Sequence, residues 1–267
     1  MKRLIAAMVA GALCLVAPAA PAQADFAERV AQADEYLATR PGVVGYVLRD
    51  RSTGLAHRNA DAGSMIWTTS TIKLAMVVDL LTRATAGQIS LTADDRQMMA
   101  DMMRTSDNDA AASLWQRFSG ADHMAFNRNF PSYGMTGLRP QQGYGDVYPD
   151  WGFQKATADD LDRLMNYTLG RLPAAQTAAI VAEMQKVSTN QQWGVWGAGP
   201  DMAPGTKNGW SPEESGWVVN SVGFAGPAQR YTLAIMNSLE DEGGFEDGVE
   251  TTTRLAEILL ASEPGAG

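Results

Sequence analysis

The chain has 267 residues, of which 45% are hydrophobic, and a formal net charge of −9 at pH 7. This length and composition predict a globular protein with one large domain or two sub-domains that share a core. The excess of acidic side chains argues against nucleic acid as a partner. A single cysteine, Cys14, and two histidines, His57 and His123, do not form a pattern typical of a metal site, so we expect neither a metal nor a cofactor.

The N-terminal residues 1–24 have the composition of a secretory signal peptide. Two basic residues precede an apolar stretch that is too short for a comfortable membrane span, and a small-x-small sequence ends at Ala24. Cys14 raises the alternative of a lipidated, retained N-terminus, but bulky Leu13 stands where a small residue is expected. We therefore predict cleavage after Ala24, no stable membrane anchor, and a mature domain over 25–267.

The mature chain begins and ends with sheet-forming segments. A helix is predicted for DFAERVAQADEYLATR, followed by a hairpin of VVGYVLRD and LAHRNA. From Ser70 to Lys186 nearly all of the sequence favours helix or loop, apart from the Pro- and Gly-rich stretch RPQQGYGDVYPDWG. GWVVNSVGFAG and QRYTLAIMNS then predict strands, and a helix closes the chain.

This order of elements predicts an α/β (α+β) fold. We expect an antiparallel sheet that is built from both chain ends and flanked by helices, with an inserted all-helical lobe. The sheet lobe would comprise residues 25–65 and 201–267, and the helical lobe residues 66–200. We expect a monomer.

Ser70 and Lys73 lie one helical turn apart in the stretch IWTTSTIKLAMVVDLL. A serine hydroxyl is a weak nucleophile at neutral pH and needs a neighbouring base, and a lysine at i+3 lies on the same helical face. To act as that base the amine must lose its proton, which burial promotes. The alternative is that Ser70 only begins a helix and that Lys73 points into water.

Two further motifs follow, Ser106-Asp107-Asn108 and Lys207-Asn208-Gly209. In this order the three motifs resemble the S-x-x-K, S-D-N and K-T-G set of class A β-lactamases and penicillin-binding proteins. The resemblance extends over most of the mature chain, because the initial helix and hairpin, the helix ATADDLDRLM and the closing strands and helix also look like that fold.

The resemblance implies a role for each matching residue. Ser70 would be the nucleophile that accepts an acyl group, Lys73 its base, and Ser106 the relay that passes a proton to the leaving nitrogen. Asn108 would bind the substrate amide, and Lys207 would supply positive charge.

The same resemblance assigns the oxyanion hole and the end of the third motif. The backbone N–H groups of Ser70 and Trp210, with Gly209 beside them, would stabilise the oxyanion. Asp107 is expected to hold a turn rather than to react. Asn208 replaces a hydroxyl residue that in the family helps to bind the substrate carboxylate. Since its amide can still donate, we expect Asn208 to bind substrate with altered recognition.

The loop GLRPQQGYGDVYPDWGFQKAT departs from the family. It lacks the E-x-x-x-N pattern that in class A enzymes positions the deacylating water, and Gln141 and Gln142 stand where the glutamate would be expected. A neutral amide cannot act as a general base. Asp146 and Asp150 are the only carboxylates in the loop, so we expect deacylation to be slow.

The sequence thus predicts a secreted or periplasmic serine hydrolase whose partner is a small acyl substrate. Ser70 would be acylated by β-lactams or related acyl compounds and deacylated slowly. Two alternatives remain: a cell-wall peptidase or esterase of the penicillin-binding type, and a catalytically dormant binding protein with this fold. The fold alone does not choose between them, because function depends on the site.

Overall fold

The computed structural model describes residues 21–260. The predicted signal peptide therefore lies outside the described residues, except for residues 21–24 at the start of the first helix. The helices are α1 (Pro21–Leu37), α2 (Ile72–Thr85), α3 (Ala93–Arg104), α4 (Asn108–Phe118), α5 (Ala125–Asn129), α6 (Ala158–Gly170), α7 (Ala174–Met184) and α8 (Phe245–Leu260). The strands are β1 (Val43–Asp50), β2 (Ala56–Arg58), β3 (Ile66–Trp67), β4 (Arg139–Pro140), β5 (Gln154–Ala156), β6 (Gly205–Glu213), β7 (Gly216–Ala225) and β8 (Tyr231–Ser238).

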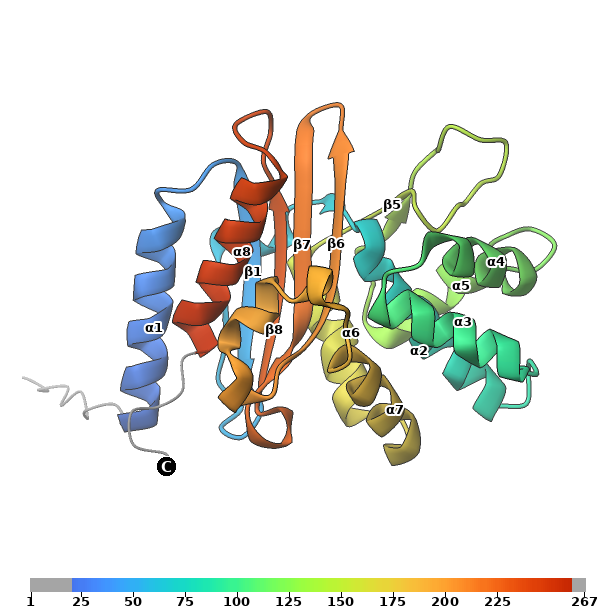
Figure 1. The fold of residues 1–267 in the computed structure, drawn as a ribbon, viewed down its shortest axis with the longest axis horizontal. Helices are drawn as coiled ribbons and strands as arrows, with labels where there is room; N and C mark the ends of the chain where they lie inside the picture. The colour runs from blue at the N-terminus through green and yellow to red at the C-terminus, as the bar shows by residue number, and fades with distance from the viewer. Residues whose placement is uncertain (1–20, 261–267) are drawn as a thin grey trace, which may run out of the picture.

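The main sheet joins the two ends of the chain, which confirms the predicted fold class. Its strand order is β2-β1-β8-β7-β6, and every neighbouring pair is antiparallel. Nearly all residues of β1, β7 and β8 are buried, as expected for strands with both faces covered. Helices α1 and α8 pack together on one face, and α6 packs on β1 and β8 from the other (Figure 1).

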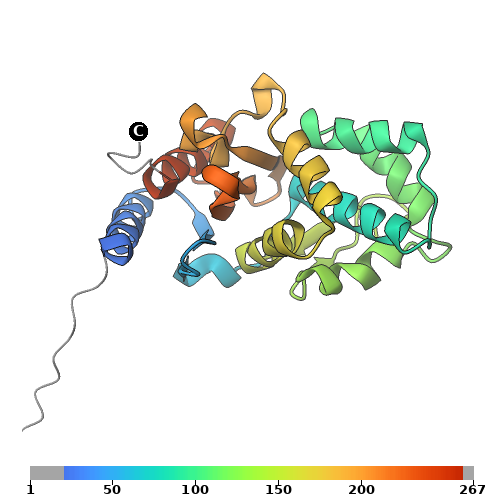
Figure 2. The same ribbon diagram turned by 90° about the horizontal axis from the view of Figure 1, so that it is seen from below.

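Most of the remaining helices gather beside the β6 edge of this sheet, where Figure 2 shows α2 surrounded by its neighbours. The first nine residues of α2, Ile72 to Leu80, are all buried. The helical spacing of the methionines in α3 predicts core packing, and Met99, Met102 and Met103 are indeed buried in the same cluster. The residues around Lys73 are therefore part of a buried core rather than a surface helix.

The inserted lobe is not all-helical, contrary to expectation. Strands β3, β5 and β4 form a second, small antiparallel sheet in that order. These strands have only two or three residues each, too few for a period of two to be recognised in the sequence.

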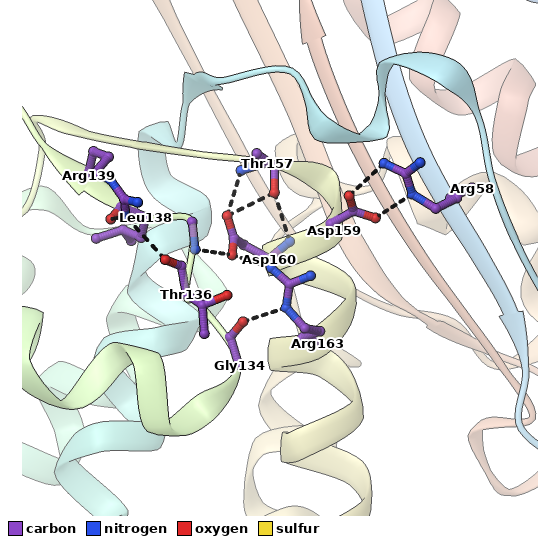
Figure 3. Close-up of polar contacts among 10 residues, drawn as sticks. Arg58, Gly134, Thr136, Leu138, Arg139, Thr157, Asp159, Asp160 and Arg163 are labelled. Carbon is purple, nitrogen blue, oxygen red and sulfur yellow. Dashed lines mark hydrogen bonds and ion pairs between the residues drawn. The ribbon is translucent and has the colours of Figure 1, made fainter.

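One buried carboxylate on α6 holds both ends of the loop that carries β4 and β5 (Figure 3). The Gly137 N–H donates to Asp160 Oδ1 over 2.8 Å, and the N–H and hydroxyl of Thr157 donate to Asp160 Oδ2 over 3.1 and 2.8 Å. Thr157 and Asp160 also form the capping box of α6. Arg163 pairs with Asp160 and donates to the Gly134 carbonyl over 2.6 Å. The loop between residues 137 and 157 is thereby fixed to α6.

Candidate active site

Segments that are far apart in the sequence meet where β6 lies against the start of α2. Ser70 is in the 3₁₀ turn η2 (Thr69–Thr71), Lys73 is on the first turn of α2, and Ser106 stands between α3 and α4. Lys207 reaches Ser106 from β6. The structure thus brings together the three motifs that the sequence suggested.

The Lys73 amine is enclosed and bonded to the second motif. It donates to the Ser106 carbonyl over 2.7 Å, to the Asn108 Oδ1 atom over 2.6 Å and to Ser106 Oγ over 3.4 Å. The side chain is fully buried. Burial lowers the pKa of Lys73 from its ordinary value to about 7, against a smaller opposite effect of the Asp107 carboxylate. A lysine with this pKa is available as a base near neutral pH.

Lys207 meets the same hydroxyl from the opposite lobe. Its amine donates to Ser106 Oγ over 2.9 Å and to the Asn208 carbonyl over 2.7 Å. Burial holds the pKa of Lys207 well below its usual value, and the charge of Lys73 lowers it further. Two buried amines that share Ser106 cannot both be charged at low cost, so the positive charge expected from Lys207 is weakened.

The Ser70 hydroxyl is not hydrogen-bonded to Lys73, although the two residues lie on the same helical face. Ser70 is half-buried, and its hydroxyl has no hydrogen-bond partner among residues 21–260. The backbone on either side of the site is strained: Thr69 has φ of 48° and Ser106 has φ of 60°. Non-glycine residues rarely adopt such values, and they cluster at functional sites.

The backbone of η2 and that of β6 are in close contact. A Cβ atom at Gly209 would lie 2.6 Å from the Ser70 nitrogen, so this approach requires glycine. Asn220 on β7 also contacts this turn. Its amide donates to the carbonyl of Trp67, which lies just before η2, over 2.8 Å, and to Thr69 Oγ1 over 3.3 Å. Asn220 was not predicted from the sequence, because nothing in a strand pattern shows which buried asparagine faces the site.

The expectation that the Asn208 amide binds substrate is wrong. Its Nδ2 atom donates to the Gln191 carbonyl over 2.7 Å and to the Trp193 carbonyl over 3.1 Å. Its Oδ1 atom accepts from the hydroxyls of Thr206 and Ser221 over 2.8 and 2.7 Å. The side chain is only 1% exposed. Both amide hydrogens are used inside the protein, so none is left for a carboxylate.

Trp210 and Asp107 also have structural roles. The Trp210 ring packs against Trp193 and Phe245, with ring centroids 5.8 and 5.7 Å apart. Trp210 is on the same face of β6 as Asn208, so only its backbone is a candidate for the oxyanion hole. Asp107 caps α4 through the Ala110 N–H over 2.8 Å, as expected for a residue that holds the turn.

The loop offers no carboxylate to Lys73 within hydrogen-bonding distance, as far as residues 21–260 show. Gln141 donates to the Pro140 carbonyl over 3.0 Å, and Gln142 to the Gly145 carbonyl over 3.4 Å. The Asp150 carboxylate accepts the Gly152 N–H over 2.8 Å. What the loop does place beside Lys73 is an indole ring.

That ring belongs to Trp151, whose centroid lies 4.6 Å from Lys73 Nζ. This distance is within the range of a cation–π contact. Trp151 was not predicted from the sequence, because a loop has no periodicity from which the direction of a side chain can be inferred.

Neither a metal cluster nor a membrane-spanning helix is found in the part of the chain that the structure describes. Within residues 21–260, no three side chains of His, Cys, Asp or Glu come together in a way that would hold a metal ion. None of the helices described is long and apolar enough to cross a bilayer.

No family model matches the chain. Curated relatives named "Putative lipoprotein LppW" from Mycobacterium tuberculosis and Mycobacterium bovis are 28% identical over 232 residues, which cover 82% of this chain and 71% of the relative.

Several solved structures have a similar fold. A β-lactamase from Xanthomonas campestris pv. campestris superposes with a TM-score of 0.72 at 18% identity, covering 88% of this chain and 97% of its own. A β-lactamase from Streptosporangium roseum gives a TM-score of 0.71 at 16% identity, with coverages of 87% and 97%. An ancestral class A β-lactamase gives 0.69 at 16% identity, with coverages of 88% and 98%. The chain therefore has a β-lactamase-like fold, in agreement with the resemblance that its motifs suggested.

Proposed function

We propose that the protein is a serine hydrolase that is acylated at Ser70 by β-lactams or related acyl compounds and releases the acyl group slowly. One observation carries the proposal: the amines of Lys73 and Lys207 converge on Ser106 Oγ, at 3.4 and 2.9 Å, beside the half-buried Ser70. The pKa of both amines is lowered, chiefly by burial. Buried ionisable groups with such shifts, gathered around a hydroxyl, are typical of catalytic sites.

In the proposed acylation, one proton moves from Ser70 to the leaving atom in steps. The neutral Lys73 amine takes the Ser70 hydroxyl proton, and Ser70 Oγ forms a bond to the carbonyl carbon of the acyl donor. Lys73 passes the proton to Ser106, which gives its own to the leaving nitrogen or oxygen as the carbonyl bond to that atom breaks. Lys207 holds the Ser106 hydroxyl in place. The products are an ester on Ser70 and a protonated leaving group.

Hydrolysis of the ester also needs a base. A water must lose a proton as its oxygen bonds to the carbonyl carbon, and Ser70 Oγ must gain one as the ester bond breaks. Lys73 is the candidate base, because no described carboxylate bonds to it and the two loop glutamines are neutral. We therefore propose that deacylation is the slower half-reaction.

For location, we propose the cell envelope, outside the cytoplasm. The start of the chain resembles a signal peptide, and the mycobacterial relatives are named as lipoproteins. The mass of the N-terminal peptide of the mature protein, determined in membrane and soluble fractions, distinguishes a released protein from a lipid-anchored one. A free N-terminus at Asp25 is expected, whereas a lipid on Cys14 would support anchorage instead.

Acylation is tested by intact mass spectrometry of the purified protein mixed with a penicillin and followed over time. We expect a single adduct of the mass of the intact penicillin, mapped to Ser70 by peptide analysis, and none in Ser70→Ala. An adduct on another serine, or one that persists in Ser70→Ala, contradicts the assignment. If Ser70 is inert to penicillins, aryl esters and fluorophosphonates alike, the chain is a dormant binding protein.

The buried Asn208 favours a second candidate, an esterase or peptidase. With both amide hydrogens bonded internally, Asn208 cannot bind the carboxylate that β-lactams carry. Neutral esters do not need that contact. If Ser70 forms an adduct with an activated aryl ester but none with any penicillin, the esterase is the better description.

A further inference from the structure

The Trp151 ring is part of the enclosure of Lys73. Its centroid is 4.6 Å from Nζ, while Ser106 and Asn108 supply the oxygen atoms that accept the amine hydrogens. Lys73 has no exposed surface, although Asn108 beside it is exposed. The indole ring therefore helps to separate the amine from solvent.

The loop that carries Trp151 is fixed in several places. The Trp115 indole N–H donates to the Pro149 carbonyl over 3.0 Å, and the Gln154 amide donates to the Asp150 carbonyl over 2.8 Å. The Gln154 carbonyl in turn accepts the Thr68 N–H over 2.8 Å, directly before η2. With both loop ends on Asp160 (Figure 3), these bonds hold Trp151 on either side of its own position.

The tip of the same loop is exposed to solvent, unlike Trp151. Tyr144, Val147 and Tyr148 are 91%, 46% and 45% exposed, whereas Trp151 is half-buried against the core. Trp151 therefore belongs, with half-buried Phe153, to the inward-facing part of the loop, whereas the apolar residues at its tip are exposed. The loop extends beyond β5 in Figure 1.

Two effects of the ring on Lys73 oppose each other. The face of an indole attracts an ammonium group, which favours the charged amine. Removal of water favours the neutral amine. Burial lowers the pKa of Lys73 to about 7, and the Trp151 ring is one of the groups that enclose the amine.

We propose that Trp151 is a positioning residue that acts through Lys73: its ring closes the amine off from solvent and thereby holds back the water that would hydrolyse an acyl group on Ser70. The second half of this proposal rests on the proposed function. The first half concerns the access of solvent to one amine and is tested without any activity.

The access of solvent is measured by brief acetylation of all lysines, followed by peptide mass spectrometry. In the wild type, Lys73 should react far more slowly than exposed Lys186. In Trp151→Ala we expect the Lys73 to Lys186 ratio to rise by about tenfold or more, because local exposure controls such labelling. Trp151→Phe keeps a ring and should stay near the wild type, and Tyr144→Ala removes an exposed ring of the same loop and should change nothing. An unchanged ratio in Trp151→Ala overturns the proposal.

The effect on hydrolysis is measured as the lifetime of the Ser70 adduct. Trp151→Ala should shorten it by about tenfold, since water is a reactant in the second step. Acylation should not become faster, because solvent beside Lys73 favours the charged amine. A purely structural role would slow both steps together. Equal lifetimes in wild type and Trp151→Ala, with normal acylation, overturn the proposal and leave the proposed function intact.

A second variant covers the case in which Trp151→Ala does not fold. Asp160→Asn leaves the site untouched but replaces the carboxylate that holds both ends of the loop. We expect faster Lys73 labelling and a shorter adduct lifetime in this protein as well. Unchanged labelling in a folded Asp160→Asn protein counts against the proposal. If the wild type forms no adduct with any acyl donor, the proposed function fails, and the labelling ratio still decides whether Trp151 closes off Lys73.

Discussion

At the scale of the residue, the site is built on a lysine that destabilises the fold near neutral pH. The pKa of Lys73 falls from 10.5 to about 7 on burial. Between these values the unfolded chain binds a proton that the folded chain does not, so this side chain makes stability fall as pH falls from 10.5 to 7. Below pH 7 the reduction in the free energy of unfolding caused by Lys73 is constant, at about 5 kcal/mol or less.

Lys73→Met removes this reduction and gives a prediction. The free energy of unfolding of Lys73→Met minus that of the wild type should grow as the pH is lowered from 10.5 to 7, by up to about 5 kcal/mol. Urea unfolding at four pH values in this range measures it. The exposed Lys186→Met is the matched control and should parallel the wild type. Parallel curves for Lys73→Met would show that Lys73 is charged in the folded protein.

At the scale of the element, β6 shows what the sequence could and could not predict. The three motifs predicted that Lys207 and Ser106 belong to one site, and the structure places the Lys207 amine 2.9 Å from Ser106 Oγ. Successive residues of a strand face opposite sides, so once Lys207 points at Ser106, Asn208 must point away. The family resemblance alone predicts substrate contact for Asn208, whereas this alternation places its side chain on the other face of β6. For Trp151 no such rule exists, because only the folded loop brings it to Lys73.

The inward Asn208 leads to a prediction about Asn208→Thr. Threonine cannot donate to both the Gln191 and the Trp193 carbonyl, so the variant should lose about 1–3 kcal/mol of stability. It should leave the ratio of acylation rates for the acid and methyl-ester forms of one β-lactam unchanged. Chemical unfolding and a paired rate measurement check the two statements. A higher ratio in Asn208→Thr would mean that this position does face the substrate carboxylate.

At the scale of the whole molecule, the pattern of strands and helices was sufficient to predict the sheet from both chain ends. The pattern works there because β1, β7 and β8 are long, apolar and buried. It failed for the small sheet of the inserted lobe, whose strands are held by a few pairs such as that of Arg139 with Lys155. The parts of the fold that carry their own periodicity were predictable, and the short connecting parts beside the site were not.

This difference between the core elements and the loop beside the site predicts the kinetics of the proposed reaction. Helix α2, strand β6 and the turn between α3 and α4 bring together Lys73, Lys207 and Ser106, for which we propose a role in acylation. The loop proposed to act in deacylation offers two glutamines and Trp151 beside Lys73. Loss of one positioned base slows a step by about 10² to 10⁴, or roughly 3–5 kcal/mol of barrier. Stopped-flow hydrolysis of a chromogenic cephalosporin should therefore show a burst of about one equivalent followed by slow turnover. Fast steady turnover without a burst or a trapped adduct would show instead that Lys73 alone, or a loop aspartate after rearrangement, activates the water efficiently.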